Sequence, residues 1–173
     1  MTNQAFLIRD ARPGDAEKLI HVHFNAVHAI AEGFYPEALL EAWSPAPAAG
    51  RYSWMCEMIG NLSNLILVGE VAGEIASFCM ASRDDGFIKA LYVDPRFSGQ
   101  GLGKHLLLSA EKQLAGLGVS RLVLKASMNA VGFYGAMGYC VVEEGWQTLG
   151  DGSEMKCCTM HKTLAPATDA LSA

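Results

Sequence analysis

The chain has 173 residues, which is enough for one domain with a hydrophobic core and too few for two domains of ordinary size. Apolar residues make up 51% and charged residues 18%, a composition that excludes a disordered protein. The net charge of −5 argues against a protein that binds nucleic acid through a basic face.

Targeting and redox features favour a cytoplasmic protein. No stretch approaches the roughly 20 apolar residues of a membrane-spanning helix, so no membrane association is predicted. The first residues lack a signal-peptide pattern, and the five cysteines show no metal spacing. An odd number of cysteines without a secretory leader is expected of reduced thiols in a cytoplasm.

The N-terminal third is expected to hold one strand followed by helical segments. Asp15 is placed to cap the first helix, and apolar residues at helical spacing extend that helix to about Glu32. Two prolines after Trp43 interrupt the helical pattern. In chain order the predicted elements are a strand at 5–9, helices at 16–32 and 36–43, a loop at 44–50 and one or two helical turns at 54–62.

From residue 65 on, the patterns predict strands in a row and then strand–helix crossovers. The predicted elements are strands at 65–71, 74–82 and 87–93, a helix at 101–117, a strand at 121–126, a short helix at 129–137 and strands at 139–148 and 154–164. The long helix carries one apolar stripe and is ended by Gly118. Its stripe comprises Leu102, Leu106, Ala110, Leu114 and Leu117. This order predicts an α/β fold with a mixed (α+β) sheet, in a single domain over 1–164 with a frayed tail at 165–173.

The stretch 91–104 indicates a ligand site. A buried strand is followed by a turn, and Gly99, Gly101 and Gly103 then open the long helix without side chains that cover the backbone. Free N–H groups at a helix N-terminus suit a phosphate or pyrophosphate. A P-loop would need glycine where Ser98 stands. A Rossmann turn would need an acidic residue at 122–128, and that stretch contains none.

A second segment, Ala130-Val131-Gly132-Phe133-Tyr134-Gly135-Ala136-Met137-Gly138-Tyr139, follows the next apolar strand. The two segments in this order resemble the GCN5-related N-acetyltransferase superfamily over roughly residues 65–164. The resemblance implies an acyl-CoA N-acyltransferase fold of order β-α-α-β-β-β-α-β-α-β-β. It also implies acetyl-CoA as cosubstrate. The cofactor-binding residues implied are Leu91, Tyr92 and Val93 for the pantetheine arm and Gly99, Gln100, Gly101, Leu102, Gly103 and Lys104 for the pyrophosphate.

The same resemblance implies that Tyr134 is the general acid that protonates the departing thiolate. The alternative role for Tyr134 is that of a half-buried aromatic of the core. The general base stays open. Some family members carry a Glu at the position of Phe87, which cannot accept a proton. A water relay could instead end on Asp84, Asp85, Glu32 or His28.

Two family positions differ in this chain. Ser98 stands where the family has Gln or Arg, which is expected to weaken cofactor binding rather than abolish it. Ser127 stands where several members carry Asn, and Asn129 is displaced by two positions, so neither is assigned that role.

The acceptor site is predicted near Phe34, Tyr35 and Trp43, since the family builds one wall of that site between its first two helices; ordinary packing is an equal alternative. No metal site is expected, because His21, His23 and His28 lack an acidic partner at ligand spacing. The predicted function is direct acetyl transfer to the amine of a small molecule or peptide, with no nucleic-acid partner and a possible homodimer through the last hairpin. The alternatives are an inactive CoA-binding sensor or regulator, or an acyltransferase with another acyl-CoA or acceptor nucleophile.

Overall fold

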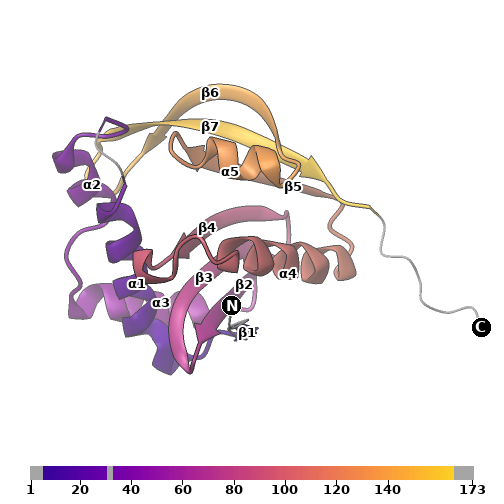
Figure 1. Cartoon of the computed structure of the whole chain (residues 1–173), viewed down its shortest axis with the longest axis horizontal. Coiled ribbons are helices and arrows are strands. Elements are labelled where there is room, and N and C mark those ends of the chain that lie inside the picture. The colour runs from indigo at the N-terminus through magenta and orange to yellow at the C-terminus, as the bar shows by residue number, and fades with distance from the viewer. Residues whose placement is uncertain (1–5, 31–32, 166–173) are drawn as a thin grey trace, which may run out of the picture.

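The structure, a computed structural model, describes residues 6–30 and 33–165. It consists of one seven-stranded sheet with helices on both faces (Figure 1). The helices are α1 (Ala16–His28), α2 (Glu37–Trp43), α3 (Ala49–Gly60), α4 (Leu102–Gly116) and α5 (Val131–Ala136). The strands are β1 (Phe6–Asp10), β2 (Asn64–Val71), β3 (Glu74–Ser82), β4 (Phe87–Val93), β5 (Arg121–Ser127), β6 (Cys140–Thr148) and β7 (Glu154–Thr163).

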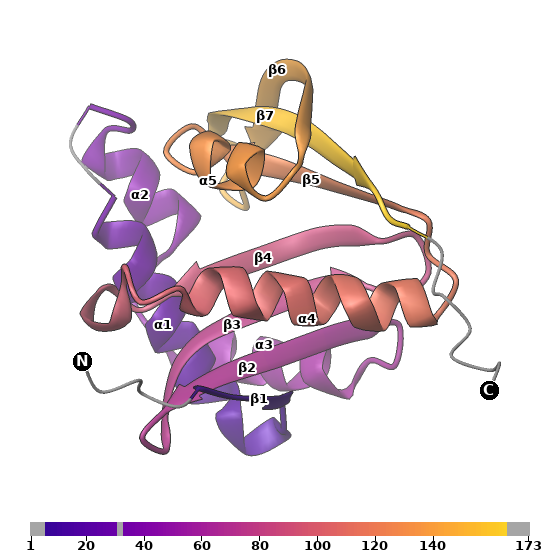
Figure 2. The ribbon, with the colours of Figure 1, turned by 45° about the vertical axis from the view of Figure 1, so that its right-hand side comes forward.

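The strand order β1-β2-β3-β4-β5-β7-β6 confirms the predicted mixed sheet. All neighbouring strands are antiparallel except β4 and β5, which are parallel. These two strands pair only at Phe87 with Val123 and at Ile88 with Leu124. Beyond that point they diverge, and Figure 2 shows the sheet opening between them. The edge of β4 that faces β5 is therefore free of strand pairing over residues 89–93.

Two hydrophobic clusters hold the helices against the sheet. On one face, α1 and α3 pack through Leu19, Ile20 and Met55 against residues of β2 and β3. On the other face, α4 and α5 pack against β2 to β5. Three residues of the predicted stripe are buried there, Leu106, Ala110 and Leu114, and a fourth, Leu102, is buried in a smaller cluster with Val71 and Ala76. Leu117 was wrongly included: it is 55% exposed, because α4 ends at Gly116 and the chain turns through Gly118 at φ +88°.

The N-terminal helices differ from the prediction. α1 ends at His28 rather than about Glu32, because its last turn tightens and the N–H of Ile30 bonds to the carbonyl of Val27. The helical turns expected at 54–62 belong to a full third helix, so three helices precede β2 where the implied family order has two. The third, α3, begins at Ala49, inside the predicted loop, because the backbone after Pro47 is again free to donate: the N–H of Tyr52 bonds to the carbonyl of Ala48.

Asp15 occupies the N-cap position of α1, but its carboxylate does not cap that helix. It accepts instead from the backbone N–H of Arg12 at 2.7 Å and from the guanidinium of Arg9 at 2.7 Å. The predicted tail after Ala165 and the start of the first strand at Ala5 lie outside the described residues. Within residues 6–30 and 33–165, no helix is long and apolar enough to cross a membrane.

Candidate active site

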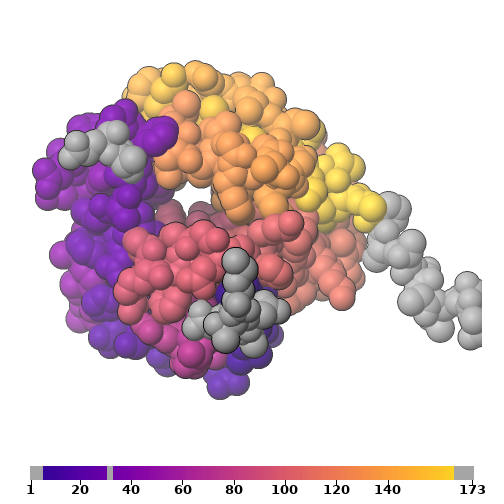
Figure 3. All heavy atoms as spheres, viewed as in Figure 1, coloured from indigo at the N-terminus to yellow at the C-terminus, as the bar shows by residue number. Residues whose placement is uncertain are grey.

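A cavity of about 600 Å³ opens where β4 and β5 part. It is lined by residues of α1, α2, α3, β3, β4, β5 and α5 and of the β6–β7 hairpin. The space-filling view shows the hollow between the β5–β7 part of the molecule and the β4–α4 part (Figure 3). The volume is typical of a site for small molecules.

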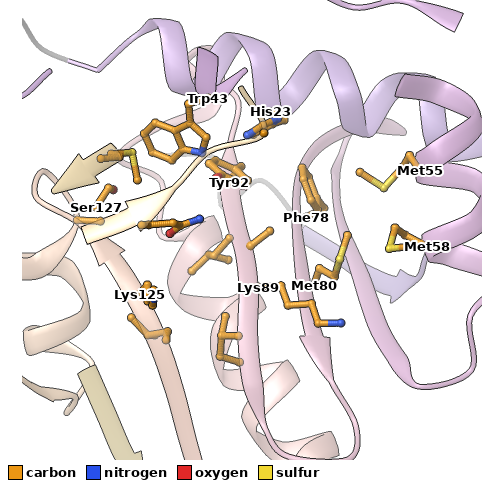
Figure 4. A pocket seen from close by; sticks show the side chains of 18 of the residues that line it. His23, Trp43, Met55, Met58, Phe78, Met80, Lys89, Tyr92, Lys125 and Ser127 are labelled. Atoms are coloured by element: carbon orange, nitrogen blue, oxygen red, sulfur yellow. The ribbon is translucent and has the colours of Figure 1, made fainter. Parts of the chain in front are cut away.

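One side of the cavity is built from aromatic and thioether side chains (Figure 4). Tyr92 of β4 lies at its centre. Its ring centroid is 4.5 Å from that of His23, 5.6 Å from that of Phe78 and 6.2 Å from that of Trp43. Met55, Met58 and Met80 complete this apolar surface. A ligand held here meets large, polarisable groups and few hydrogen-bonding partners.

His23 and Arg51 form the main polar pair of the cavity. Nη2 of Arg51 lies 3.0 Å from Nδ1 of His23. Because a guanidinium can only donate, Nδ1 is the acceptor and Nε2 carries the ring proton. Burial, together with the Arg51 charge, lowers the pKa of His23 to about 3. His23 is therefore a neutral side chain at physiological pH, with its basic nitrogen already occupied.

Tyr134 of α5 lines the cavity and is only 7% exposed. Its ring packs edge-on against Phe133 and Tyr139, with centroids 5.2 Å and 5.6 Å away. Burial raises the pKa of Tyr134, so the hydroxyl keeps its proton and can act as a donor at any physiological pH. No described residue forms a hydrogen bond with this hydroxyl, which leaves it available to a ligand.

Next to Tyr139, a partly buried ion pair joins α4 to β7. Lys162 donates to Oε2 of Glu111 at 2.7 Å, and the hydroxyl of Tyr139 donates to Oε1 at 3.0 Å. These bonds hold Tyr139, and through the contact between the two rings they support the position of Tyr134.

The glycine-rich turn has the backbone that the sequence predicts. Gly99 and Gly101 have φ angles of +75° and +81°, a region that favours glycine. Within the described chain, the N–H groups of residues 99–104 have no backbone acceptor, and the first bond is from His105 to Gly101. The carboxylate of Asp94 anchors the turn, since it accepts from the N–H of Arg96 at 3.0 Å and from the Asn25 amide at 3.1 Å.

The three aromatics predicted to enclose the acceptor are not brought together in the cavity wall. Trp43 lines it. Phe34 is 46% exposed and does not. Tyr35 is buried outside the lining, where its hydroxyl donates to the Lys156 carbonyl at 2.6 Å and accepts from the Met128 N–H at 2.7 Å. Tyr35 thus ties the segment before α2 to the end of β5 and to β7.

The candidate bases also lie away from the cavity. Asp84 and Asp85 belong to the β3–β4 turn, where Asp85 accepts from the N–H of Phe87 at 3.0 Å. Nε2 of His28 is bonded to the Ser44 carbonyl at 2.9 Å. None of the three, nor Phe87, is a lining residue. Glu32 lies outside the described residues.

The histidines of α1 have separate partners rather than a common one. His21 lies next to Tyr52, with its Nε2 3.4 Å from the hydroxyl, while His23 and His28 have the contacts given above. Across residues 6–30 and 33–165 there is no group of three or more His, Cys, Asp or Glu placed to hold a metal ion.

The basic side chains of the cavity were not predicted from the sequence. Arg51, Lys89 and Lys125 come from α3, β4 and β5 and are 36 or more residues apart in the chain. No spacing pattern links them to each other or to Tyr134. Only the tertiary structure brings them to one cavity.

A family model described as an acetyltransferase (GNAT) domain matches residues 34–163. A solved GCN5-related N-acetyltransferase from Rhodopseudomonas palustris, described also as "Aminotransferase, Class-II", is similar to this chain. It has 25% identity and a TM-score of 0.85, with 95% of this chain and 99% of that chain covered.

Two further structures share the fold. PaiA N-acetyltransferase from Thermoplasma acidophilum, solved in complex with coenzyme A, has 22% identity and a TM-score of 0.70 over 92% of this chain and 99% of that chain. The ribosomal-protein-S18-alanine N-acetyltransferase from Escherichia coli has 20% identity and a TM-score of 0.70 over 98% and 100%. No match was found among curated protein sequences. The matched family model covers most of the chain, and the chain therefore belongs to the GNAT family of acetyltransferases.

Proposed function

We propose that this protein transfers the acetyl group of acetyl-CoA directly to the amine of an acceptor held in the cavity. The observation that carries the proposal is the parting of β4 and β5 after Ile88 and Leu124, which opens a cavity next to the hydroxyl of Tyr134. The free edge of β4 lies along this opening, and the glycine-rich turn follows directly after β4.

The residues present fit acetyl-CoA. The unpaired backbone of Leu91, Tyr92 and Val93 can bond the amide groups of a pantetheine arm in the manner of an added strand. The N–H groups of Gly99 to Lys104 have no backbone acceptor in the described chain and suit the pyrophosphate. Asp94 and Asn25 fix the position of this turn against α1 before any ligand binds.

Acetyl-CoA supplies the thioester, and the residues of the cavity hold the thioester and the amine while the acetyl group is transferred. The acceptor nitrogen bonds to the acetyl carbon as the carbon–sulfur bond breaks, so the nitrogen loses one proton and the sulfur gains one. Tyr134 is proposed to donate a hydrogen bond or a proton to the departing sulfur. Because burial raises the pKa of Tyr134, its stabilising effect is mainly that of a hydrogen-bond donor.

On the acceptor side, Trp43 supports the proposed binding wall, because its ring lies in the lining next to Tyr92. Phe34 and Tyr35 are not lining residues, so the proposal assigns them no direct contact with the acceptor. His23 does not serve as the general base, because its Nδ1 accepts from Arg51.

The direct test measures CoA release from acetyl-CoA over a panel of amines, alongside calorimetric titration with acetyl-CoA. Release that depends on an amine supports the transferase. Tight binding without release in the presence of any amine would favour a CoA-binding sensor or regulator. Release with a longer acyl-CoA only would favour another acyltransferase.

A homodimer remains a proposal that rests on β6. This strand is at one end of the sheet and exposes Val141, Val142 and Trp146. An edge strand with apolar side chains is suited to pairing with a second copy. Sedimentation equilibrium of the parent and of a Val142→Lys variant tests it. The cytoplasmic location likewise stays a prediction.

A further inference from the structure

The lining of the cavity is positively charged, although the chain as a whole is acidic. Arg51, Lys89 and Lys125 lie in it, and no Asp or Glu of the described residues does. The chain has 18 acidic and 13 basic residues, so a lining whose charged side chains are all basic differs from the composition of the whole chain. A charged wall of one sign selects ligands of the opposite sign.

Arg51 is the best-positioned of the three. It lies in the first turn of α3, where its Nη1 donates to the Pro45 carbonyl and its Nη2 contacts His23 and, at 3.4 Å, the Ser44 hydroxyl. All three partners are neutral. No carboxylate of the described chain forms an ion pair with Arg51, and its Nε–H has no acceptor there. The guanidinium is held in place while its charge remains uncompensated.

The two lysines extend the positive wall along the diverging strands. Lys89 of β4 donates to the side-chain oxygen of Asn64 at 2.7 Å, which is again a neutral partner. Lys125 lies across the opening on β5 (Figure 4). Neither forms an ion pair within the part of the chain that the structure describes.

We propose that the acceptor is a small amine that also carries a carboxylate, of the class of α-amino acids with an apolar or aromatic side chain, and that Arg51 binds its carboxylate. This inference rests on the proposed function and specifies its substrate. A guanidinium fork matches a carboxylate in geometry and charge. The lining rings and thioethers, among them Trp43, Phe78 and Met55, suit the apolar part of such a molecule.

The same charges disfavour the other amine classes. A polyamine or an aminoglycoside carries several positive charges and would meet Arg51, Lys89 and Lys125 without a described carboxylate to balance them. For an amino acid, the positive wall also favours the neutral form of the amine over the ammonium, and the neutral form is the nucleophile.

The test compares phenylalanine, phenethylamine and spermidine as acceptors at the same concentration of free amine. Phenethylamine has the same ring and amine as phenylalanine but no carboxylate. We expect kcat/KM for phenylalanine to exceed that for phenethylamine about 10- to 100-fold, which is the effect of a charge-assisted hydrogen-bonded pair. Arg51→Gln should remove this preference by lowering kcat/KM for phenylalanine alone. Arg51→Lys should retain part of it, because the charge remains and the fork is lost.

Arg121→Gln is the matched control, because it removes one positive charge at the exposed start of β5, outside the lining. It should keep the parent's preference, and the melting temperatures of all variants show whether they fold. Equal or better use of phenethylamine or spermidine by the parent would overturn the inference and leave acetyl transfer intact.

A second measurement separates the two proposals. The CoA-bound protein is titrated with N-acetylphenylalanine, which needs no turnover. Binding by the parent that Arg51→Gln weakens about 10-fold or more supports the carboxylate site even if no amine is acetylated, in which case only the transferase proposal fails. Absence of binding by the parent at millimolar concentration, or binding that Arg51→Gln leaves unchanged, overturns the inference.

Discussion

The rings of Tyr134 and Tyr139 pack edge-on with their centroids 5.6 Å apart, yet only the Tyr139 hydroxyl has a partner in the described structure. Tyr139 donates to Glu111 at 3.0 Å, whereas Tyr134 presents its hydroxyl beside the cavity. The two tyrosines, which are neighbours in space, therefore differ in their surroundings: the Tyr139 hydroxyl is bonded within the fold, and the Tyr134 hydroxyl has no described partner. The same conservative substitution can be made at both.

Tyr134→Phe removes the proposed donor and keeps the ring. General acid catalysis contributes about 10²- to 10⁴-fold, and the raised pKa of Tyr134 argues for the lower end of that range. We expect single-turnover acetyl transfer to slow about 100-fold with little change in acetyl-CoA affinity. Tyr139→Phe is the control: it should lower the melting temperature and keep the transfer rate. A Tyr134→Phe rate within threefold of the parent would falsify the donor role.

Gly101→Val tests the pyrophosphate turn. Gly101 has φ +81°, so valine is strained there, and a branched side chain would stand where the phosphates are proposed to approach. Gly118→Val is matched in strain, since Gly118 has φ +88° at the other end of α4 and open space around it. Both variants should lose a similar amount of stability. Only Gly101→Val should lose acetyl-CoA binding in calorimetry, and equal affinity in the two would place the site elsewhere.

Trp43→Ala tests the acceptor wall. Trp43 lies in the cavity lining against Tyr92, so its removal should raise KM for the acceptor at least tenfold while KM for acetyl-CoA changes little. Trp146→Ala, on the exposed face of β6, controls for the loss of an indole. If both Michaelis constants of Trp43→Ala rise together as its melting temperature falls, Trp43 serves packing.

His23 makes the stability of the fold depend on pH. Its pKa in the folded protein is lowered to about 3 from an ordinary 6.5. Between pH 3 and pH 6.5, His23 is therefore protonated in the unfolded chain and neutral in the folded chain. Stability from this group is full above pH 6.5 and is lost as pH falls toward 3, by up to about 1.4 kcal/mol per pH unit.

Urea unfolding between pH 4 and 8 measures this effect. His23→Gln keeps an acceptor for Arg51 without a titrating ring, and it should flatten the dependence below pH 6.5. His21→Gln, on the exposed side of the same helix, controls for the loss of an imidazole. The assignment is refuted if the parent and His23→Gln lose stability in parallel as the solution is acidified.

The sequence by itself was sufficient for the features that are local in the chain. The alternating strands, the apolar stripe of α4 and the glycines before it each depend on neighbours within a few residues, so the seven strands and the turn at 99–104 were predicted nearly to the residue. Helix ends were less predictable. α1 stops at His28 and α3 starts at Ala49, because terminal hydrogen bonds and packing on the sheet decide those boundaries.

The character of the cavity was decided by tertiary structure alone. Phe34 and Tyr35 were predicted to form the acceptor wall together with Trp43, but the fold exposes Phe34 and fixes Tyr35 between Lys156 and Met128. Arg51 reaches His23 because α1 and α3 pack side by side on one face of the sheet. Lys89 and Lys125 share one opening because β4 and β5 pair at only two positions. Contacts between residues 28 or more positions apart produce no periodic pattern in a sequence. The positive charge of the site could therefore be recognised only from the folded structure.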